Sequence, residues 1–143
     1  MTGSPEHEIT ALIHEYGFRL DAGDLDGVAA LFEHAELGST KHDRRRRGTA
    51  EARTIYDNVI IYDDGTPQTL HQLTNVTVDV EDAHATARSC FTVLQVTGQG
   101  LHPTLAGYYH DRFECVDGTW RFTERIFDPR LIGDMSRHMK PES

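Results

Sequence analysis

Apolar residues recur at helical spacing in the amino-terminal part of the chain. The first segment opens with Ser4 and Pro5, residue types that are favoured at the N-cap and at the first helical position. The apolar positions that follow lie on one helical stripe and are Ile9, Leu12, Ile13, Tyr16 and Leu20. Two further segments with this spacing cover residues 24–32, with Asp24 as a cap, and residues 49–62. The pattern therefore predicts three N-terminal helices.

From Gln68 onward the apolar period changes to two, which is typical of β-strands. The expected strands cover residues 68–80, 84–98, 104–116 and 119–127. Asp117-Gly118 predicts a tight hairpin turn, and residues 130–143 are expected to form a short helical turn and a frayed tail. Helices followed by antiparallel strands predict an α+β fold in which one face of the sheet is buried against the helices.

The first expected strand carries a histidine and an asparagine within an alternating pattern. Because residues two and four apart in a strand share a face, His71 and Asn75 are expected to point the same way. The opposite face of this strand would then carry an apolar stripe that consists of Val76, Val78 and Val80. Because such a stripe is costly to leave in water, we expect a homo-oligomer, a dimer or a trimer, that buries this convex face of the sheet.

Length and composition narrow the class of protein. A chain of 143 residues with 38% hydrophobic and 26% charged residues is expected to fold as one domain, residues 1–143. Its formal net charge of −9 argues against binding to nucleic acids or to anionic membranes, because both surfaces would repel it. The sequence has neither an apolar run of about eighteen residues nor a secretory signal pattern, so a cytoplasmic location is expected.

Three polar side chains are expected to meet inside this fold. If His71 faces the helices, burial disfavours its cation, and a carboxylate is needed to orient and stabilise the ring. Asp21 lies at the end of the first helix, near the edge of its apolar stripe, and Tyr16 lies on the stripe itself. A carboxylate, an imidazole and a phenol in one pocket can abstract a proton and protonate a leaving group. The residues alone also allow a structural interpretation, in which the histidine is exposed or bonded to backbone, the aspartate ends a helix and the tyrosine belongs to the core.

Three sequence segments carry a resemblance to a known family. They are LDAGDLDGVAALF at residues 20–32, the His-x-x-x-Asn run at residues 71–75, and GYYHDRFECVDGTWRFTER at residues 107–125. Together with the order of elements, they resemble the SnoaL-like branch of the nuclear transport factor 2-like superfamily over nearly the whole chain. The resemblance implies a cone-shaped α+β fold, with three N-terminal helices packed on a curved antiparallel sheet and a deep pocket at the open end. The pattern is most similar to that of scytalone dehydratase, bile-acid 7α-dehydratase and hexachlorocyclohexane dehydrochlorinase.

The resemblance also implies roles for individual residues. In the dehydratase and dehydrochlorinase members, a histidine on the first long strand is the base and pairs with an aspartate, and His71 and Asp21 match these positions. Tyr16 matches a tyrosine five residues before that aspartate, and Arg125 matches an arginine on the last strand that lines the cavity. The residues expected to contact substrate are Asn75, Tyr56, Leu105, Tyr109, Asp111 and Phe113. An acidic residue that the bile-acid enzyme carries on its middle strand has no match here, which argues against that particular substrate.

Together, the residues and the resemblance predict a cofactor-independent lyase or isomerase that is similar to a dehydratase. Its expected substrate is a small hydrophobic molecule that is hydroxylated or polycyclic. Neither a cofactor nor a metal is expected, and the partners are a small-molecule substrate and further copies of the chain. Two alternatives stay open, a polyketide cyclase of the same fold and a non-catalytic accessory subunit that resembles the small subunit of aromatic-ring dioxygenases. Arg44–Arg47 are interpreted as a solvated surface loop, with a lid that grips an anionic substrate as the alternative.

Overall fold

The computed structural model describes residues 3–141. Its first element, helix α1 (Pro5–Asp21), begins where the Ser4 Oγ atom accepts a hydrogen bond from the backbone N–H of His7, at 3.2 Å. The buried residues of this helix are Ile9, Ile13, Tyr16, Gly17 and Leu20. The apolar stripe predicted for the first helix is therefore confirmed, apart from Leu12, which is only partly buried.

Two short helices follow, and a hairpin separates them. Helix α2 (Leu25–Ala30) and helix α3 (Gly48–Ile55) flank strands β1 (Glu36–Ser39) and β2 (His42–Arg47). The loop expected at the arginine run is thus a strand, and the third helix ends at Ile55 instead of extending to residue 62. The apolar pattern does not reveal β2, because an edge strand keeps polar residues on both faces. Within the described residues, no helix combines the length and apolarity that a membrane crossing requires.

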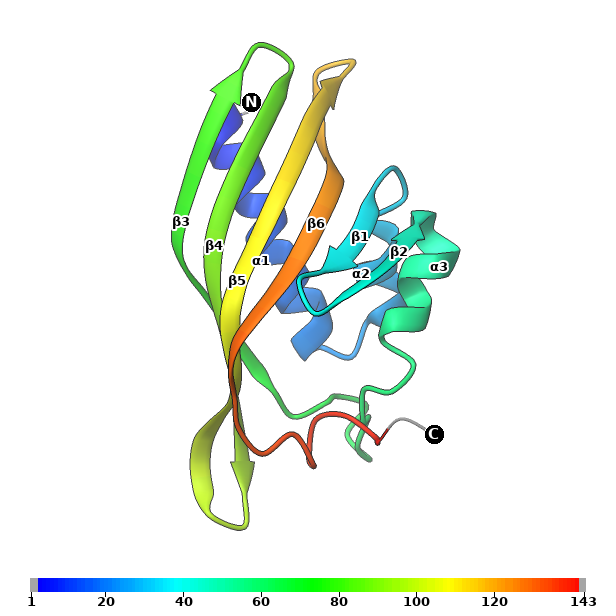
Figure 1. Cartoon of the computed structure of the whole chain (residues 1–143), viewed down its shortest axis with the longest axis vertical. Coiled ribbons are helices and arrows are strands. Elements are labelled where there is room, and N and C mark those ends of the chain that lie inside the picture. Colours follow the sequence, from blue (N-terminus) through cyan, green and yellow to red (C-terminus); the bar gives the residue numbers. More distant parts are fainter. Residues whose placement is uncertain (1–2, 142–143) are drawn as a thin grey trace.

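In residues 3–141, six strands form one curved sheet in the order β2-β1-β6-β5-β4-β3 (Figure 1). The four long strands are β3 (Leu70–Glu81), β4 (His84–Thr97), β5 (Gly100–Val116) and β6 (Thr119–Ile132). These four strands pair antiparallel as expected, whereas β1 pairs with β6 in parallel. The sheet is therefore mixed and not antiparallel throughout. Helix α1 packs against β3 and covers one face of the sheet (Figure 1).

A bulge in β3 reverses the alternation that the sequence suggests. Thr74 pairs with Cys90 and Thr77 pairs with Arg88, so β3 carries one residue more than β4 between these two pairs. At this point Asn75 adopts a positive φ of 52° and its side chain is exposed. Beyond the bulge, the residues that pack against the core are Val76, Val78 and Val80. The prediction that these valines form an outer apolar stripe is therefore wrong. The prediction that Asn75 and His71 point the same way is wrong for the same reason.

The carboxy-terminal residues pack against the segment that follows α3. Strand β6 continues to Ile132 instead of ending at residue 127. Beyond it, Met139 forms a β-bridge with Val59, and the backbone N–H of Ile60 donates to the carbonyl oxygen of His138 at 2.9 Å. The expected frayed tail is therefore wrong as far as Lys140, because backbone hydrogen bonds hold this segment in place. Residues 142–143 lie outside the described part of the chain.

Candidate active site

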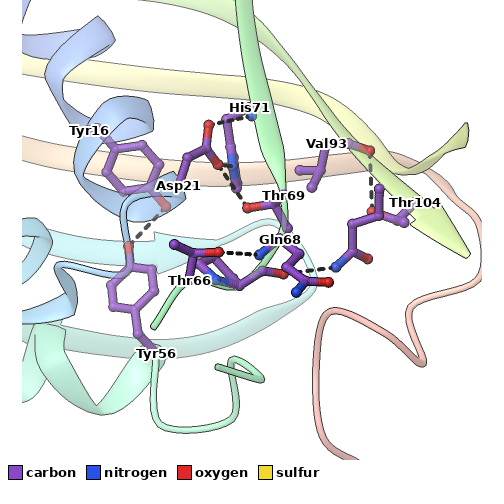
Figure 2. Close-up of polar contacts among 11 residues, drawn as sticks. Tyr16, Asp21, Tyr56, Thr66, Gln68, Thr69, His71, Val93 and Thr104 are labelled. Atoms are coloured by element: carbon purple, nitrogen blue, oxygen red, sulfur yellow. Dashed lines mark hydrogen bonds and ion pairs between the residues drawn. The ribbon is translucent and has the colours of Figure 1, made fainter. Parts of the chain in front are cut away.

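His71 on β3 and Asp21 at the end of α1 form a hydrogen-bonded pair (Figure 2). The Nδ1 atom of His71 lies 2.6 Å from Asp21 Oδ1, and the His71 side chain is 3% exposed. The backbone N–H of His71 and the hydroxyl of Thr69 donate to the same carboxylate, each at 2.8 Å. Strand β3 therefore fixes the carboxylate with two donors besides the imidazole that it orients.

This pair sets the protonation pattern of the imidazole. Because a carboxylate only accepts hydrogen bonds, Asp21 favours the tautomer of His71 that carries its proton on Nδ1. The other ring nitrogen, Nε2, then carries a lone pair, and the ring lines an adjacent cavity. Asp21 can also stabilise the imidazolium that forms when Nε2 accepts a proton. The geometry suits a general base.

The cavity beside the pair has a volume of about 170 Å³. Its wall is mostly aliphatic and aromatic and includes Leu20, Ile55, Val59, Phe91, Val93 and Phe127. An apolar protein cavity of roughly 150 Å³ is large enough to bind benzene. The volume therefore suits a molecule with one ring better than a polycyclic molecule.

Three tyrosines line the cavity from different elements, and they are Tyr16, Tyr56 and Tyr109. The hydroxyl of Tyr56 donates to that of Tyr16 at 3.0 Å, and the rings of Tyr16 and His71 meet edge-on with centroids 6.5 Å apart. Burial raises the pKa of Tyr16, and the nearby Arg125 cation and the Tyr56 hydrogen bond reduce that rise. Burial also raises the pKa of Tyr56 and of Tyr109. All three phenols are therefore neutral near pH 7 and can donate a hydrogen bond.

Arg125 lies behind this aromatic wall and does not line the cavity. Its side chain is 0% exposed, and its Nε and Nη2 atoms donate to the two oxygens of Asp111 at 2.7 and 2.9 Å. The guanidinium packs over the rings of Tyr109 and Tyr16, 3.9 and 4.5 Å from their centroids. Burial raises the pKa of Asp111, and the adjacent Arg125 opposes that rise. The prediction that Arg125 and Asp111 face the substrate is therefore wrong. The buried pair instead packs behind two cavity tyrosines.

The remaining predicted contact residues divide into two groups. Leu105 lines the cavity, together with two of the tyrosines. Phe113 packs in the core against Phe122, with ring centroids 4.6 Å apart, and Asn75 is exposed on β3. Leu105 therefore belongs to the candidate site, whereas Phe113 and Asn75 do not.

The carboxy-terminal segment forms one side of the cavity with Met135, His138 and Met139, which the sequence did not predict. The ring of His138 lies 6.1 Å from that of His71, measured between centroids, and the residue is 5% exposed. Its Nδ1 atom is buried and has no hydrogen-bond partner among the described residues. Burial lowers the pKa of His138 to about 4, and the neighbouring His71 acts in the same direction. The spacing of these residues, three and four apart, is a signal of a shared face that the frayed-tail interpretation overlooked.

The side chains around the cavity are suited to proton transfer. They comprise one imidazole oriented by a carboxylate, three neutral phenols and a second imidazole that is neutral near pH 7. Within residues 3–141, no three His, Cys, Asp or Glu side chains are grouped so as to hold a metal ion.

Comparison with solved structures shows where this architecture recurs. The chain is similar to an NTF2-like protein with a cystatin-like fold from Novosphingobium aromaticivorans, at 24% identity over 86% of this chain and 80% of that chain, with a TM-score of 0.73. A provisionally named scytalone dehydratase from the same organism is 24% identical over 90% of this chain and 85% of its own, with a TM-score of 0.70. The beta subunit of a provisionally named aromatic-ring-hydroxylating dioxygenase from that organism is 18% identical, over 89% and 90% of the two chains, with a TM-score of 0.69. These likenesses show the fold.

The sequence profile of the SnoaL-like domain matches residues 4–126, from the N-cap of α1 into β6. This stretch is most of the chain and contains both Asp21 and His71, and it confirms the resemblance inferred from the sequence. The chain therefore belongs to the SnoaL-like domain family and has its NTF2-like fold.

Proposed function

We propose that the protein is a cofactor-independent lyase or isomerase that acts on a small, hydroxylated and mainly apolar molecule by general acid–base catalysis. The observation that carries the proposal is the 2.6 Å contact between His71 Nδ1 and Asp21 Oδ1 at the wall of an apolar cavity. An imidazole held in this way is suited to accept a proton, because its carboxylate partner stabilises the imidazolium that results.

A dehydration can be written with these residues. In a β-hydroxy carbonyl substrate, His71 Nε2 removes the proton from the carbon next to the carbonyl group. The electron pair of that C–H bond forms the C=C bond, and the C–O bond to the hydroxyl group breaks. Tyr16 donates its phenolic proton to the leaving oxygen, so that water departs, and transfer of the proton from His71 to Tyr16 restores both groups. An isomerase would return the proton to another carbon instead.

Two features outside the pair support this assignment. Because its pKa is lowered to about 4, His138 is neutral near pH 7 and can hydrogen-bond a substrate oxygen without competing as a base. The Arg125 cation, 4.5 Å from the centroid of the Tyr16 ring, favours the phenolate that forms when this tyrosine gives up its proton.

The decisive experiment is turnover of single-ring β-hydroxy carbonyl compounds and cyclic alcohols by the wild type and by His71→Gln. We expect the variant to fold normally and to lose roughly two to four orders of magnitude in kcat. His110→Gln is the matched control, because His110 Nε2 also contacts an aspartate, Asp128, at 3.0 Å, but 44% of its side chain is exposed. Full turnover by His71→Gln would contradict the proposal.

The two alternative functions predict different results in the same experiment. A binding or accessory subunit predicts that no compound in the panel is turned over, and that His71→Gln changes ligand affinity only modestly. A polyketide cyclase predicts turnover of a longer, linear substrate that depends on His71. The cavity volume of about 170 Å³ argues against a product with several rings.

We also propose that the protein self-associates through the outer face of the sheet, near the turn between β4 and β5. Residues paired across strands share a face, and Leu70 pairs with Leu94 while Val96 pairs with Leu101. Leu70, Val96 and Leu101 are 55%, 68% and 69% exposed, which favours burial against another copy. Light scattering at micromolar concentration tests this, and a mass of 16.1 kDa, that of one chain, would contradict it.

A further inference from the structure

A second hollow, of about 200 Å³, adjoins the apolar cavity at the edge of the sheet. It is lined by β1, β2, the end of α3 and β6, and it shares Ile55 and Phe127 with the cavity. Its polar lining includes Ser39, His42 and Arg46, and among the described residues no Asp or Glu lines it. The two hollows therefore meet at Ile55 and Phe127, and the second one carries a cation, Arg46.

Strand pairing explains why these side chains lie on the cavity side of the sheet. Ser39 of β1 pairs with His42 on one side and with Phe127 on the other. Phe127 pairs in turn with the cavity residue Tyr109. Arg46 pairs with Leu37, which is buried in the core. Because residues paired across strands point to the same face, both His42 and Arg46 face the concave side, where β2 lies beside α3 (Figure 1).

Arg46 differs from its neighbours in the arginine run in the partner it has. Arg45 and Arg47 both lie against Glu36, with N–O distances of 3.5 and 3.0 Å. The Nε atom of Arg46 donates to Thr54 Oγ1 at 3.1 Å, which holds the side chain, and within the described part of the chain it forms no ion pair. The two Nη groups of Arg46 are therefore available to an anion, and a guanidinium can bind both oxygens of a carboxylate.

We propose that Arg46 and His42 bind a carboxylate at the end of a short chain on the molecule that occupies the apolar cavity. The inference rests on the proposed function only in taking the cavity as the substrate site. The ligand class is then an aromatic or alicyclic acid, with its ring beside His71 and its carboxylate in the second hollow. Because the protein carries a net charge of −9, an anion is repelled by most of its surface, and an available cation at this place gives the ligand a preferred orientation.

The test compares 4-phenylbutyrate with its uncharged amide, 4-phenylbutyramide, in titrations followed by NMR. We expect the wild type to bind the acid roughly threefold to tenfold more tightly than the amide, as an ion pair that keeps some contact with water provides. Arg46→Gln should bind the two compounds equally. Arg47→Gln is the matched control, because it removes the same charge one residue away, from a side chain paired with Glu36, and it should keep the preference.

Several outcomes would overturn the proposal. Equal affinities of acid and amide in the wild type would do so, and so would equal losses in Arg46→Gln and Arg47→Gln, which would indicate only a change in overall charge. The ring signals of His71 should shift with both compounds, and an acid preference without this shift would mean that the acid binds elsewhere. The 3-phenylpropanoate and 5-phenylpentanoate homologues vary the chain length, and failure of all three acids to bind at millimolar concentration also rejects the site.

Because these titrations measure binding alone, they separate this site from the proposed chemistry. If the acid preference depends on Arg46 while His71→Gln keeps full turnover, the carboxylate site stands and the acid–base function fails. If turnover requires His71 while Arg46→Gln keeps the acid preference, the function stands and the carboxylate site fails.

Discussion

The described residues include two contacts between a histidine and an aspartate, and they lie on opposite sides of the sheet. His71 Nδ1 is 2.6 Å from Asp21, and His110 Nε2 is 3.0 Å from Asp128. The His71 side chain is 3% exposed beside the cavity, whereas that of His110 is 44% exposed. The two contacts have similar lengths, yet only His71 can meet a molecule in the apolar cavity.

In the outer pair, which consists of His110 and Asp128, an arginine neutralises the carboxylate. Asp128 accepts two hydrogen bonds from Arg130, at 2.9 and 3.0 Å, and one from Thr40 at 3.2 Å. The bonds from Arg130, followed by the bond from His110, hold the pKa of Asp128 well below its usual range. This carboxylate therefore serves a network that joins β6 to the β1–β2 turn, and His110 is one of several partners.

In the inner pair, which consists of His71 and Asp21, the carboxylate has no arginine or lysine partner within residues 3–141. Apart from the imidazole, Asp21 accepts hydrogen bonds from the Thr69 hydroxyl and from the His71 backbone N–H. Its negative charge is thus left to stabilise a positive charge on His71. The neighbours of the carboxylate, more than the length of the contact, therefore distinguish a candidate base from a histidine that only supports a structural network.

The largest expected effect is the difference in kcat between two variants, in which the aspartate of the inner or of the outer pair is replaced by asparagine. Asp21→Asn should lower kcat by roughly two to four orders of magnitude, because an amide can favour the wrong tautomer of His71 and cannot stabilise its cation. Asp128→Asn should leave kcat nearly unchanged. Turnover of the substrate panel measures both, with circular dichroism as the check on folding. Equal losses in the two variants would remove the distinction between the inner and outer pairs.

The next effect concerns the buried ion pair behind the inner site. Asp111→Asn should lower the free energy of unfolding by about 3–5 kcal/mol, because it leaves the charge of Arg125 buried without a counter-ion. The double variant Asp111→Leu/Arg125→Met should recover much of that loss, since no charge then stays buried. On the outer face, Arg130→Gln should cost less than Asp111→Asn, because the Arg130 side chain is 60% exposed and Asp128 keeps its hydrogen bonds from His110 and Thr40. Urea unfolding measures all three, and a small loss in Asp111→Asn would contradict the role assigned to the pair.

Acid should affect the two sides of the sheet in different pH ranges. The pKa of His138 is about 4 in the folded protein and 6.5 ordinarily, so the unfolded chain binds this proton first as the pH falls. Stability is therefore lost between pH 6.5 and 4, by up to about 3 kcal/mol. Asp128 has a lowered pKa, so its contribution is present above its ordinary value of 3.8 and is lost only as the pH falls further.

Hydrogen exchange can follow the acid effect at the carboxy-terminal segment. The backbone N–H of Ile60 donates to the carbonyl oxygen of His138 at 2.9 Å, so its protection should fall between pH 6.5 and 4. His138→Gln should abolish this pH dependence, while the amides around Asp128 should stay protected over the same range. Constant protection of Ile60 in the wild type would show that His138 gains its proton without moving the segment.

The parts of the site that the sequence predicts are those fixed by regular periodicity. Helix α1 follows the helical spacing from its cap to Asp21, and His71 lies where β3 is still regular. The meeting of these two elements follows from packing one apolar stripe on one sheet face. The Asp21–His71 contact could therefore be predicted before its geometry was known.

The parts that the sequence did not predict depend on pairing or on long-range contact. Strand β2 is held by its pairing with β1, and its run of arginines carries no apolar signal. The place of His138 depends on the bridge between Met139 and Val59, residues far apart in the sequence.

Two further features depend on individual side chains. The resemblance placed Arg125 on the correct strand face, but whether it is exposed to the cavity depends on the rings of Tyr16 and Tyr109 that cover it. The bulge at Asn75 depends on one residue and reverses the facing of every residue after it.

The smallest expected effect tests that bulge, which decides which residues of β3 lie on the same side as the inner pair. Asn75 has a φ of 52°, a conformation that glycine adopts without strain and that most residues with a Cβ adopt at a cost. Asn75→Ala should therefore lower the free energy of unfolding by about 1 kcal/mol, and Asn75→Gly should change it less, with kcat unchanged in both. Strict alternation along β3 would instead put Asn75 in the cavity beside His71, and both variants would then lose turnover. A loss of kcat in Asn75→Gly with an unchanged urea midpoint would mean that β3 is regular through this position and that its valines face outward.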